Sequence, residues 1–179
     1  CVGYEARWSA ALVATAAQTP ECAARLVEDI VLFDQQGCLS PSVVLAENGP
    51  QLDAWCGELA VALQSAEVRL PRGKVDAVRS AGLRLWRESA RLGIALGTVR
   101  RLWESSGSSA WAVALTEPGV ALASPLDRHV VVMPVSMAGR AARESMEVVR
   151  AAFGPRLARL QGLGRDSTGW SGEVRDAWI

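Results

Sequence analysis

One cysteine stands in a short polar turn between two apolar segments, in a place where a thiol can do chemistry. Residues 32–41 read LFDQQGCLSP, so Cys38 follows a glycine and has Gln36 and Ser40 beside it. A nucleophilic cysteine needs an exposed sulfur, backbone N–H groups that hold an oxyanion, and surroundings that favour the thiolate. A loop between a helix and a sheet strand is expected to meet the first two conditions, because ligand sites of open α/β sheets gather in such connections. The neighbouring residues do not supply the third, so spacing alone leaves a catalytic and a structural role equally open.

The other polar side chains of this turn have structural roles to weigh beside chemical ones. Gln35 and Gln36 either orient a bound carbonyl group or hydrogen-bond the turn backbone, and the second role is the commoner. Ser40 precedes a proline and is typical of a loop hydroxyl. Asp34 is interpreted as a turn residue, because a nearby carboxylate raises the pKa of a thiol and so disfavours the thiolate of Cys38.

Few other residues offer reactive or metal-binding groups. Cys22 and Cys56 fall on apolar helical faces and are expected to be small buried hydrophobic residues, and Cys1 is terminal. No cysteines show CxxC spacing. The single histidine, His129, opens a predicted strand, and a histidine in that place is more often a strand-edge residue than a metal ligand. We therefore expect no metal site and no disulfide.

Composition limits the class of protein. The chain has 179 residues, 50% of them hydrophobic, which predicts a single domain, residues 1–179, with a sizeable core. Its 19 basic and 19 acidic side chains cancel, so neither nucleic acid nor an anionic membrane surface is an expected partner. No apolar stretch predicts a membrane span and no signal peptide is visible, which indicates a cytoplasmic protein. The first residue is not methionine, so we expect a piece of a longer chain.

Apolar periodicity predicts an α/β fold with a largely parallel sheet flanked by helices. Helical spacing of apolar residues is found over residues 20–32, 51–64, 74–103 and 137–153. Internal glycines are candidate breaks in the segment over residues 74–103. Short apolar runs bounded by turn residues predict strands over residues 42–46, 111–116, 120–123 and 129–135. Residues 162–170, rich in Gly, Ser and Thr, are expected to form a loop.

Three segments carry a family resemblance. Residues 29–41, DIVLFDQQGCLSP, resemble the catalytic segment of the LuxC-type acyl-CoA reductases, a branch of the aldehyde dehydrogenase superfamily, in which a helix end runs into a Gln-Gln-small-Cys-x-Ser-Pro turn. Residues 124–135, SPLDRHVVVMPV, are similar to the segment before the last helix of that family. Residues 159–164, RLQGLG, are similar to its Leu-Gln-Thr-x-Gly turn, with Gly162 in place of threonine. The resemblance implies an aldehyde dehydrogenase-like catalytic domain over nearly the whole chain.

The resemblance also implies a mechanism. The thiolate of Cys38 attacks an acyl-CoA or acyl-carrier thioester, with a long-chain acyl group implied by the family, and expels the carrier thiol. NADPH then reduces the acyl-enzyme to an aldehyde. The backbone N–H of Cys38 is one implied oxyanion donor, and Gln36, Gln35 and Ser40 are the candidates that support the substrate.

The chain departs from the family pattern where the cofactor is concerned. In the superfamily the dinucleotide-binding domain lies largely before the catalytic segment, and no GxGxxG loop is present here. The Glu-x-Phe-Gly-Pro motif that contacts the cofactor ribose is replaced by residues 124–128, where Arg128 is the candidate cofactor-binding residue. The resemblance thus implies a missing cofactor-binding domain. It also implies a homo-oligomer, because members of the superfamily generally associate through this domain.

Two rival readings remain open. Another superfamily reaction at the same thiol, aldehyde oxidation or acyl-phosphate reduction, is the first, and oxidation would need a glutamate near Cys38 to activate water. A non-catalytic interaction domain that keeps the fold is the second, and it predicts a poorly reactive Cys38 with an apolar assembly patch. The arginine-rich residues 72–101 are interpreted as a solvated helix face rather than as a contact for CoA phosphates.

Overall fold

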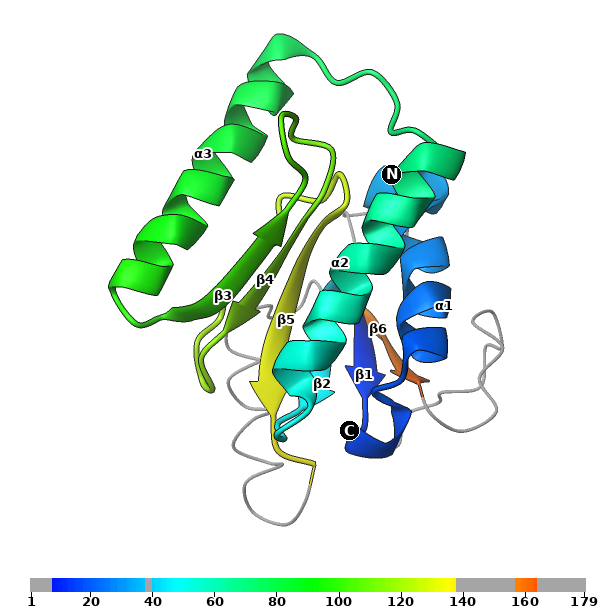
Figure 1. The fold of residues 1–179 in the computed structure, drawn as a ribbon, viewed down its shortest axis with the longest axis vertical. Helices are drawn as coiled ribbons and strands as arrows, with labels where there is room; N and C mark the ends of the chain where they lie inside the picture. The colour runs from blue at the N-terminus through cyan, green and yellow to red at the C-terminus, as the bar shows by residue number, and fades with distance from the viewer. Residues whose placement is uncertain (1–7, 38–39, 138–156, 164–179) are drawn as a thin grey trace, which may run out of the picture.

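The computed structural model describes residues 8–37, 40–137 and 157–163, which form a six-stranded sheet with helices packed against it (Figure 1). The helical segments are η1 (Thr15–Ala17), α1 (Pro20–Val31), η2 (Leu32–Gln35), α2 (Leu52–Arg69) and α3 (Ala77–Ala95). The strands are β1 (Trp8–Val13), β2 (Pro41–Glu47), β3 (Val99–Glu104), β4 (Ala112–Thr116), β5 (His129–Val135) and β6 (Leu157–Leu163). No helix among these residues has the length and apolar character needed to cross a bilayer.

The strand order is β3-β4-β5-β2-β1-β6. Every neighbouring pair is parallel except β3 with β4, which is antiparallel. Helices α1 and α2 lie side by side in front of the sheet in Figure 1, and α3 packs near the β3 edge. The prediction of an α/β fold with a mostly parallel sheet flanked by helices is confirmed.

Buried apolar side chains form clusters on both faces of the sheet. The larger cluster joins α1 and α2 to the strands and includes Leu26 and Trp55, each about 1% exposed. The smaller cluster contains Leu45 and Met133, against which Trp86 of α3 packs. Burial of apolar area on both faces is the dominant stabilising contribution for such a layered domain.

Helix α1 begins where its sequence predicts. The Thr19 side chain accepts a hydrogen bond from the backbone N–H of Cys22 (3.2 Å), and Pro20 takes the first helical position. The predicted helix over residues 20–32 is confirmed, and it ends at Val31. The predicted helix over residues 51–64 is also present, but α2 continues for another turn and ends at Arg69.

The helical stretch predicted over residues 74–103 breaks at Gly97, one of its internal glycines, and the residues that follow are wrongly predicted as helix. Helix α3 ends at Ala95, and Gly97 adopts a left-handed conformation (φ +69°) that only glycine takes without strain. The Thr98 N–H returns to the Gly93 carbonyl (2.8 Å), and the chain then enters β3. Pairing with β4 makes a strand of residues whose Arg, Leu and Glu content suits a helix.

The strand predictions need three corrections. Residues 120–123 form no strand, because Gly119 (φ +79°) makes a turn after β4 and these residues find no partner in the described sheet. Two strands, β1 and β6, have no counterpart among the predictions, and Gly162 lies in β6 rather than in the expected loop. The predicted strands over residues 42–46, 111–116 and 129–135 are confirmed as β2, β4 and β5. The predicted helix over residues 137–153 lies almost wholly outside the described residues.

Candidate active site

The turn that carries Cys38 starts with an unusual backbone. After α1 ends, Phe33, Asp34 and Gln35 have φ values of 57°, 53° and 64°, in the left-handed region, although none is glycine. Such conformations cost roughly 1 kcal/mol or more per residue. Cys38 itself lies outside the described residues, so the structure defines the chain on either side of it, up to Gly37 and from Ser40 onward. Contacts from elsewhere must hold this conformation.

Contacts within the segment fix both sides of Cys38. Gln35 is about 1% exposed, and its Nε2 donates to the Pro41 carbonyl (2.9 Å), which ties the turn to the start of β2. The Ser40 hydroxyl donates to the carbonyl of Asp29 in α1 (2.8 Å), and the Ser40 N–H donates to the Gly37 carbonyl (3.0 Å). The contacts of Gln35 and Ser40 are thus with the backbone, as their structural interpretation predicts.

A second left-handed run lies against the first. Leu126, Asp127 and Arg128, which lead into β5, have φ values of 68°, 54° and 63°. Gln36 Nε2 donates to Asp127 Oδ1 (3.0 Å), and Arg128 Nε donates to Oδ1 of Asp34 (2.7 Å). Two strained segments more than 90 residues apart are therefore cross-linked by side chains. Strain held in this way is typical of functional sites.

Arg128 is the centre of this cross-link. Its side chain is about 2% exposed, and besides Asp34 it donates to Glu67 Oε2 (2.9 Å) and to the Leu70 carbonyl (2.7 Å). Asp127 is about 1% exposed and is also bound by Arg79. The guanidinium that the sequence assigns to the cofactor is thus directed at protein acceptors, while its cofactor role stays a prediction.

The connection between α2 and α3 completes the surroundings of the turn. The N–H of Gly73 donates to Asp34 Oδ2 (3.1 Å), so both oxygens of this carboxylate are engaged. The N–H of Arg72 donates to the Glu67 carboxylate at 3.3 Å. Asp34, interpreted as a turn residue from the sequence, is therefore the acceptor that joins the turn to Arg128 and to the α2–α3 connection.

The sole histidine is a buried structural group. His129 is fully buried, and its ring nitrogens contact the Asp127 carbonyl (Nδ1, 2.8 Å) and Arg87 Nε (Nε2, 3.2 Å). A guanidinium can only donate, so Nε2 accepts and Nδ1 carries the proton. Burial lowers the pKa of His129 to about 4. His129 is therefore neutral at pH 7, and it is no strand-edge residue but lies inside.

Arg87 departs from the solvated helix face that the sequence predicts for residues 72–101. It is about 6% exposed and donates to the carbonyls of Ser108 (2.8 Å) and Trp111 (2.6 Å). Its neighbours Arg84 and Arg91 are exposed, as that interpretation predicts. Periodicity gives little warning, because an arginine at a core-facing position differs from its neighbours only through its partners in space.

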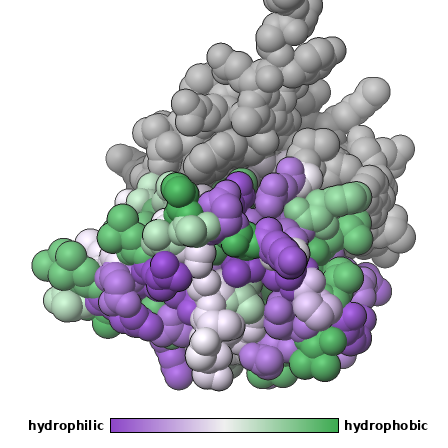
Figure 2. Space-filling model, turned by 90° about the horizontal axis from the view of Figure 1, so that it is seen from above, coloured by the Kyte–Doolittle hydropathy of each residue, from purple (hydrophilic) through white to green (hydrophobic). Residues whose placement is uncertain are grey.

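The turn lies at the amino ends of the parallel strands. It precedes β2, the Asp127–Arg128 run precedes β5, and the loop over residues 105–111 precedes β4, all at the upper edge in Figure 1. Figure 2 looks onto this edge and shows hydrophilic residues over much of it. The turn thus lies in the helix-to-strand connection that the sequence predicts, although ligand sites of open α/β sheets usually gather at the carboxyl ends of the strands.

The described cysteines are poor nucleophiles. Cys56 is fully buried, and burial raises the pKa of its thiol far above the ordinary range. Cys22 is half-buried, and burial raises its pKa too. Among the described residues no cluster of His, Cys, Asp or Glu is arranged to hold a metal ion.

Comparison with known proteins assigns the sequence to a family. The family model of the acyl-CoA reductases (LuxC) matches residues 1–150. No curated protein matches the sequence. The similar solved structures are dehydrogenases of low sequence identity, so they show the fold alone.

Three of these structures illustrate the likeness. Gamma-glutamyl-gamma-aminobutyraldehyde dehydrogenase from Burkholderia cenocepacia has a TM-score of 0.61 and 14% identity over 90% of this chain and 38% of its own. An NAD-dependent benzaldehyde dehydrogenase from Corynebacterium glutamicum has a TM-score of 0.54 and 13% identity over 91% of this chain and 41% of its own. The 1-pyrroline-5-carboxylate dehydrogenase of Thermus thermophilus has a TM-score of 0.52 and 17% identity over 86% and 35%.

This chain therefore spans only about two fifths of the length of these dehydrogenases. Its fold is that of these aldehyde dehydrogenases. With the family model covering 150 of 179 residues, the chain belongs to the acyl-CoA reductase (LuxC) family.

Proposed function

We propose that this chain carries the acylation step of an NADPH-dependent acyl-thioester reductase, with Cys38 as the nucleophile. The supporting observation is the anchored turn, in which Gln36 is bound by Asp127 and Ser40 is bound to α1 on the two sides of Cys38. A turn held in strain by distant side chains suits a thiol that must meet a carbonyl carbon in one geometry.

The chemistry assigned to the chain is thioester exchange. The Cys38 thiolate attacks the carbonyl carbon of an acyl-CoA or acyl-carrier thioester, and the new C–S bond forms as negative charge moves to the oxygen. Collapse of this intermediate breaks the bond to the carrier sulfur, which leaves as a thiolate and takes a proton from water. The acyl group then remains on Cys38, and the backbone N–H of Cys38 is the proposed oxyanion donor.

NADPH, when bound, supplies the hydride that turns the acyl-enzyme into an aldehyde and frees the thiolate. The described residues do not fit a complete dinucleotide site, because the connection from β2 to α2, residues 48–51, is a tight turn without a glycine-rich phosphate loop. We therefore assign cofactor binding to a separate domain, and we assign Arg128 to holding the turn. Because the reaction needs a free thiol, the cytoplasm is the compartment that suits it.

The carboxylates around the turn favour thioester reduction over aldehyde oxidation. Oxidation requires a free carboxylate to activate water. Asp34 and Glu67 are both engaged by Arg128, and Asp127 is engaged by Arg79 and Gln36. Carboxylates whose oxygens are held by guanidinium groups are not free to bind and orient a water molecule, so this set does not serve hydrolysis.

The proposal is tested by incubating the protein with an acyl-CoA and measuring the intact mass, the modified peptide and the released CoA thiol. We expect one acyl group on Cys38, one equivalent of CoA released, and no adduct in the Cys38→Ala variant. The matched control is Cys22→Ser, which removes a half-buried thiol and should leave acylation unchanged. An adduct spread over several cysteines, or none at Cys38, would overturn the proposal and favour a non-catalytic domain.

A further inference from the structure

A polar pocket opens between α3 and the loop that joins β3 to β4. It has a volume of about 580 Å³, and its lining consists of Arg84, Arg87, Glu88, Arg91 and residues 104–109. That loop reads ESSGSS, so serine residues line the pocket together with three arginines. The function proposed above makes no use of this pocket.

The charged side chains of the pocket have a net positive charge. Arg91 binds both glutamates of the lining, Glu88 and Glu104, and Arg87 is also paired with Glu104 (3.5 Å), so two guanidinium groups neutralise these two carboxylates within the protein. In contrast, the structure records no ion pair for Arg84 or for Arg72, whose partners in the described chain are the Ser80 hydroxyl and the Ser109 carbonyl. The guanidinium of Arg84 in the lining is thus available to an anion, and that of Arg72 lies beside the pocket against Ser109.

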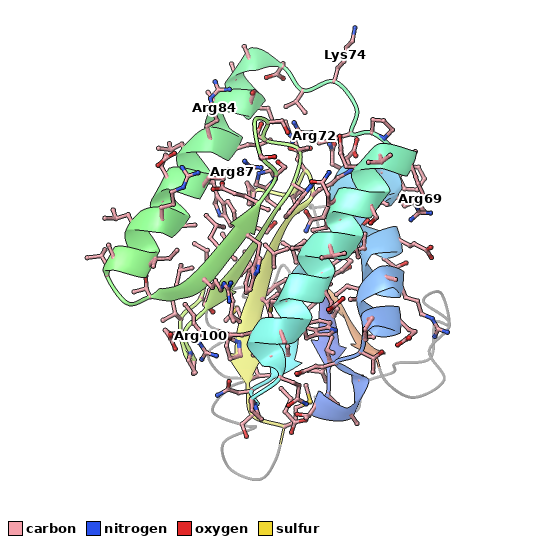
Figure 3. All side chains as sticks on the ribbon, viewed as in Figure 1. Arg69, Arg72, Lys74, Arg84, Arg87 and Arg100 are labelled. Atoms are coloured by element: carbon pink, nitrogen blue, oxygen red, sulfur yellow. The ribbon has the colours of Figure 1, made fainter. Side chains whose placement is uncertain are left out.

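Neighbouring arginines strengthen the positive field. Burial lowers the pKa of Arg87, and the nearby charges of Arg91 and Arg72 lower it further, against the opposite effect of Glu104. Figure 3 shows Arg72 and Arg87 on the two sides of the β3–β4 loop, with Arg84 further along α3. An anion bound there would offset this mutual repulsion.

The loop between β3 and β4 is exposed at its tip and anchored at its base. Gly107 at its tip has φ +68°, and Ser106, Gly107 and Ser108 are exposed. The loop is held from behind, because Arg87 Nη1 donates to the Ser108 carbonyl (2.8 Å) and Arg72 Nη1 donates to that of Ser109 (2.7 Å). The Ser105 and Ser108 hydroxyls are hydrogen-bonded within the loop, whereas no hydrogen bond of the Ser106 or Ser109 hydroxyl is recorded among the described residues, so these two hydroxyls can donate to a ligand.

The pocket is coupled to the Cys38 turn. Arg72 contacts the loop through its side chain and Glu67 through its N–H, and Glu67 binds Arg128, which binds Asp34 of the turn. Both sites lie at the amino-terminal edge of the sheet. A ligand with a phosphate at one end and a reactive group at the other end of a long arm can therefore approach both.

We propose that this pocket binds a ribose-linked phosphate monoester of a nucleotide ligand, held by Arg84, Arg72 and the serine loop. The identity of the ligand rests on the proposed function, in which two molecules carry such a group: CoA at the ribose 3′ position and NADPH at the 2′ position. CoA is the favoured occupant, because the thioester is the ligand that must reach Cys38.

The test measures binding by calorimetry with the Cys38→Ala protein, so that no chemistry interferes. We expect CoA to bind about tenfold or more tightly than dephospho-CoA, because charge-assisted hydrogen bonds to the phosphate are lost. Arg84→Gln and Arg72→Gln should each weaken CoA binding about tenfold and leave dephospho-CoA unchanged. The control is Arg69→Gln, an exposed arginine at the end of α2 that is outside the pocket lining (Figure 3).

Each outcome decides something. If NADPH binds more tightly than NADH and the arginine variants remove this difference, with CoA binding unaffected, the pocket is supported and is assigned to the cofactor. Equal binding of CoA and dephospho-CoA together with equal binding of NADPH and NADH would overturn it. An equal effect of Arg69→Gln and Arg84→Gln would also overturn it, because it would indicate non-specific charge attraction. Acylation of Cys38 without any phosphate effect refutes the pocket alone, and a phosphate effect without acylation refutes the proposed function alone.

Discussion

Replacing Arg128 by methionine tests whether one buried guanidinium holds the Cys38 turn. The change keeps much of the apolar stem but removes the donors to Asp34, Glu67 and the Leu70 carbonyl. Loss of one partner of a buried ion pair costs about 3–5 kcal/mol. The partners here are 22% and 24% exposed, so water can partly replace the guanidinium. We therefore expect the lower end, a loss of about 3 kcal/mol in the free energy of unfolding.

The assay is urea denaturation followed by tryptophan fluorescence, with Arg128→Lys and Arg69→Met as companions. Lysine keeps the charge but not the planar fork, so an intermediate loss is expected. Arg69 is exposed and has no recorded partner within residues 8–37, 40–137 and 157–163, so its replacement should change stability by less than about 0.5 kcal/mol. A loss below about 1 kcal/mol for Arg128→Met would refute the reasoning.

Hydrogen exchange separates a local effect from a global one. If Arg128 holds the turn, amides near Gln35 and Ser40 should exchange faster in Arg128→Met even in conditions where the domain stays folded. The same amides should keep their protection in Arg69→Met. Uniform loss of protection across the sheet, with no excess at the turn, would show that Arg128 stabilises the domain without holding the turn in particular.

Three further predictions concern single groups in the core. Burial lowers the pKa of His129 to about 4, against 6.5 in the unfolded chain, so the unfolded state binds more protons between these two pH values. The free energy of unfolding should therefore fall by up to about 3 kcal/mol as the pH drops from 6.5 to 4. Urea denaturation at several pH values should show a weaker pH dependence of stability for His129→Gln. A Cβ on Gly93 would lie 2.7 Å from Cγ2 of Val99, so Gly93→Ala should lower the melting temperature. A Cβ on Gly82 would have no heavy atom within 4 Å, so Gly82→Ala should raise the melting temperature through its higher helix propensity. Equal shifts for the two variants would contradict this contrast. Cys56 should resist iodoacetamide at pH 8 in the native protein and react on unfolding, and fast native labelling would show that its burial is misjudged.

The sequence by itself determined the local features of the chain. Helix α1 begins at Thr19 and Pro20 because a capping hydroxyl and a fixed proline φ act over one turn of chain. Strands β2, β4 and β5 are short, strongly apolar runs between turn residues, which periodicity identifies without knowledge of their partners. The candidate nucleophile Cys38 and its neighbours Gln36 and Ser40 form one contiguous segment, so a resemblance over that segment was enough to find them.

Only the tertiary structure decided the elements whose sequence is ambiguous. Strand β1, with the sequence WSAALV, holds small residues that favour a helix, and it becomes a strand because β2 and β6 pair with it on both sides. Strand β3 depends on antiparallel pairing with β4 and on the left-handed Gly97 that ends α3. Residues 120–123 have strand propensity but no partner, and propensity without a partner makes no strand.

The same physical reason separates the two parts of the site. The types of residue around Cys38 are local, but what holds them comes from far along the chain: Asp127 binds Gln36, and Arg128 binds Asp34. A run of left-handed residues without glycine is unfavourable by local sterics, so no local pattern predicts it. It exists because packing brings a guanidinium and a carboxylate to it, and that juxtaposition depends on the fold.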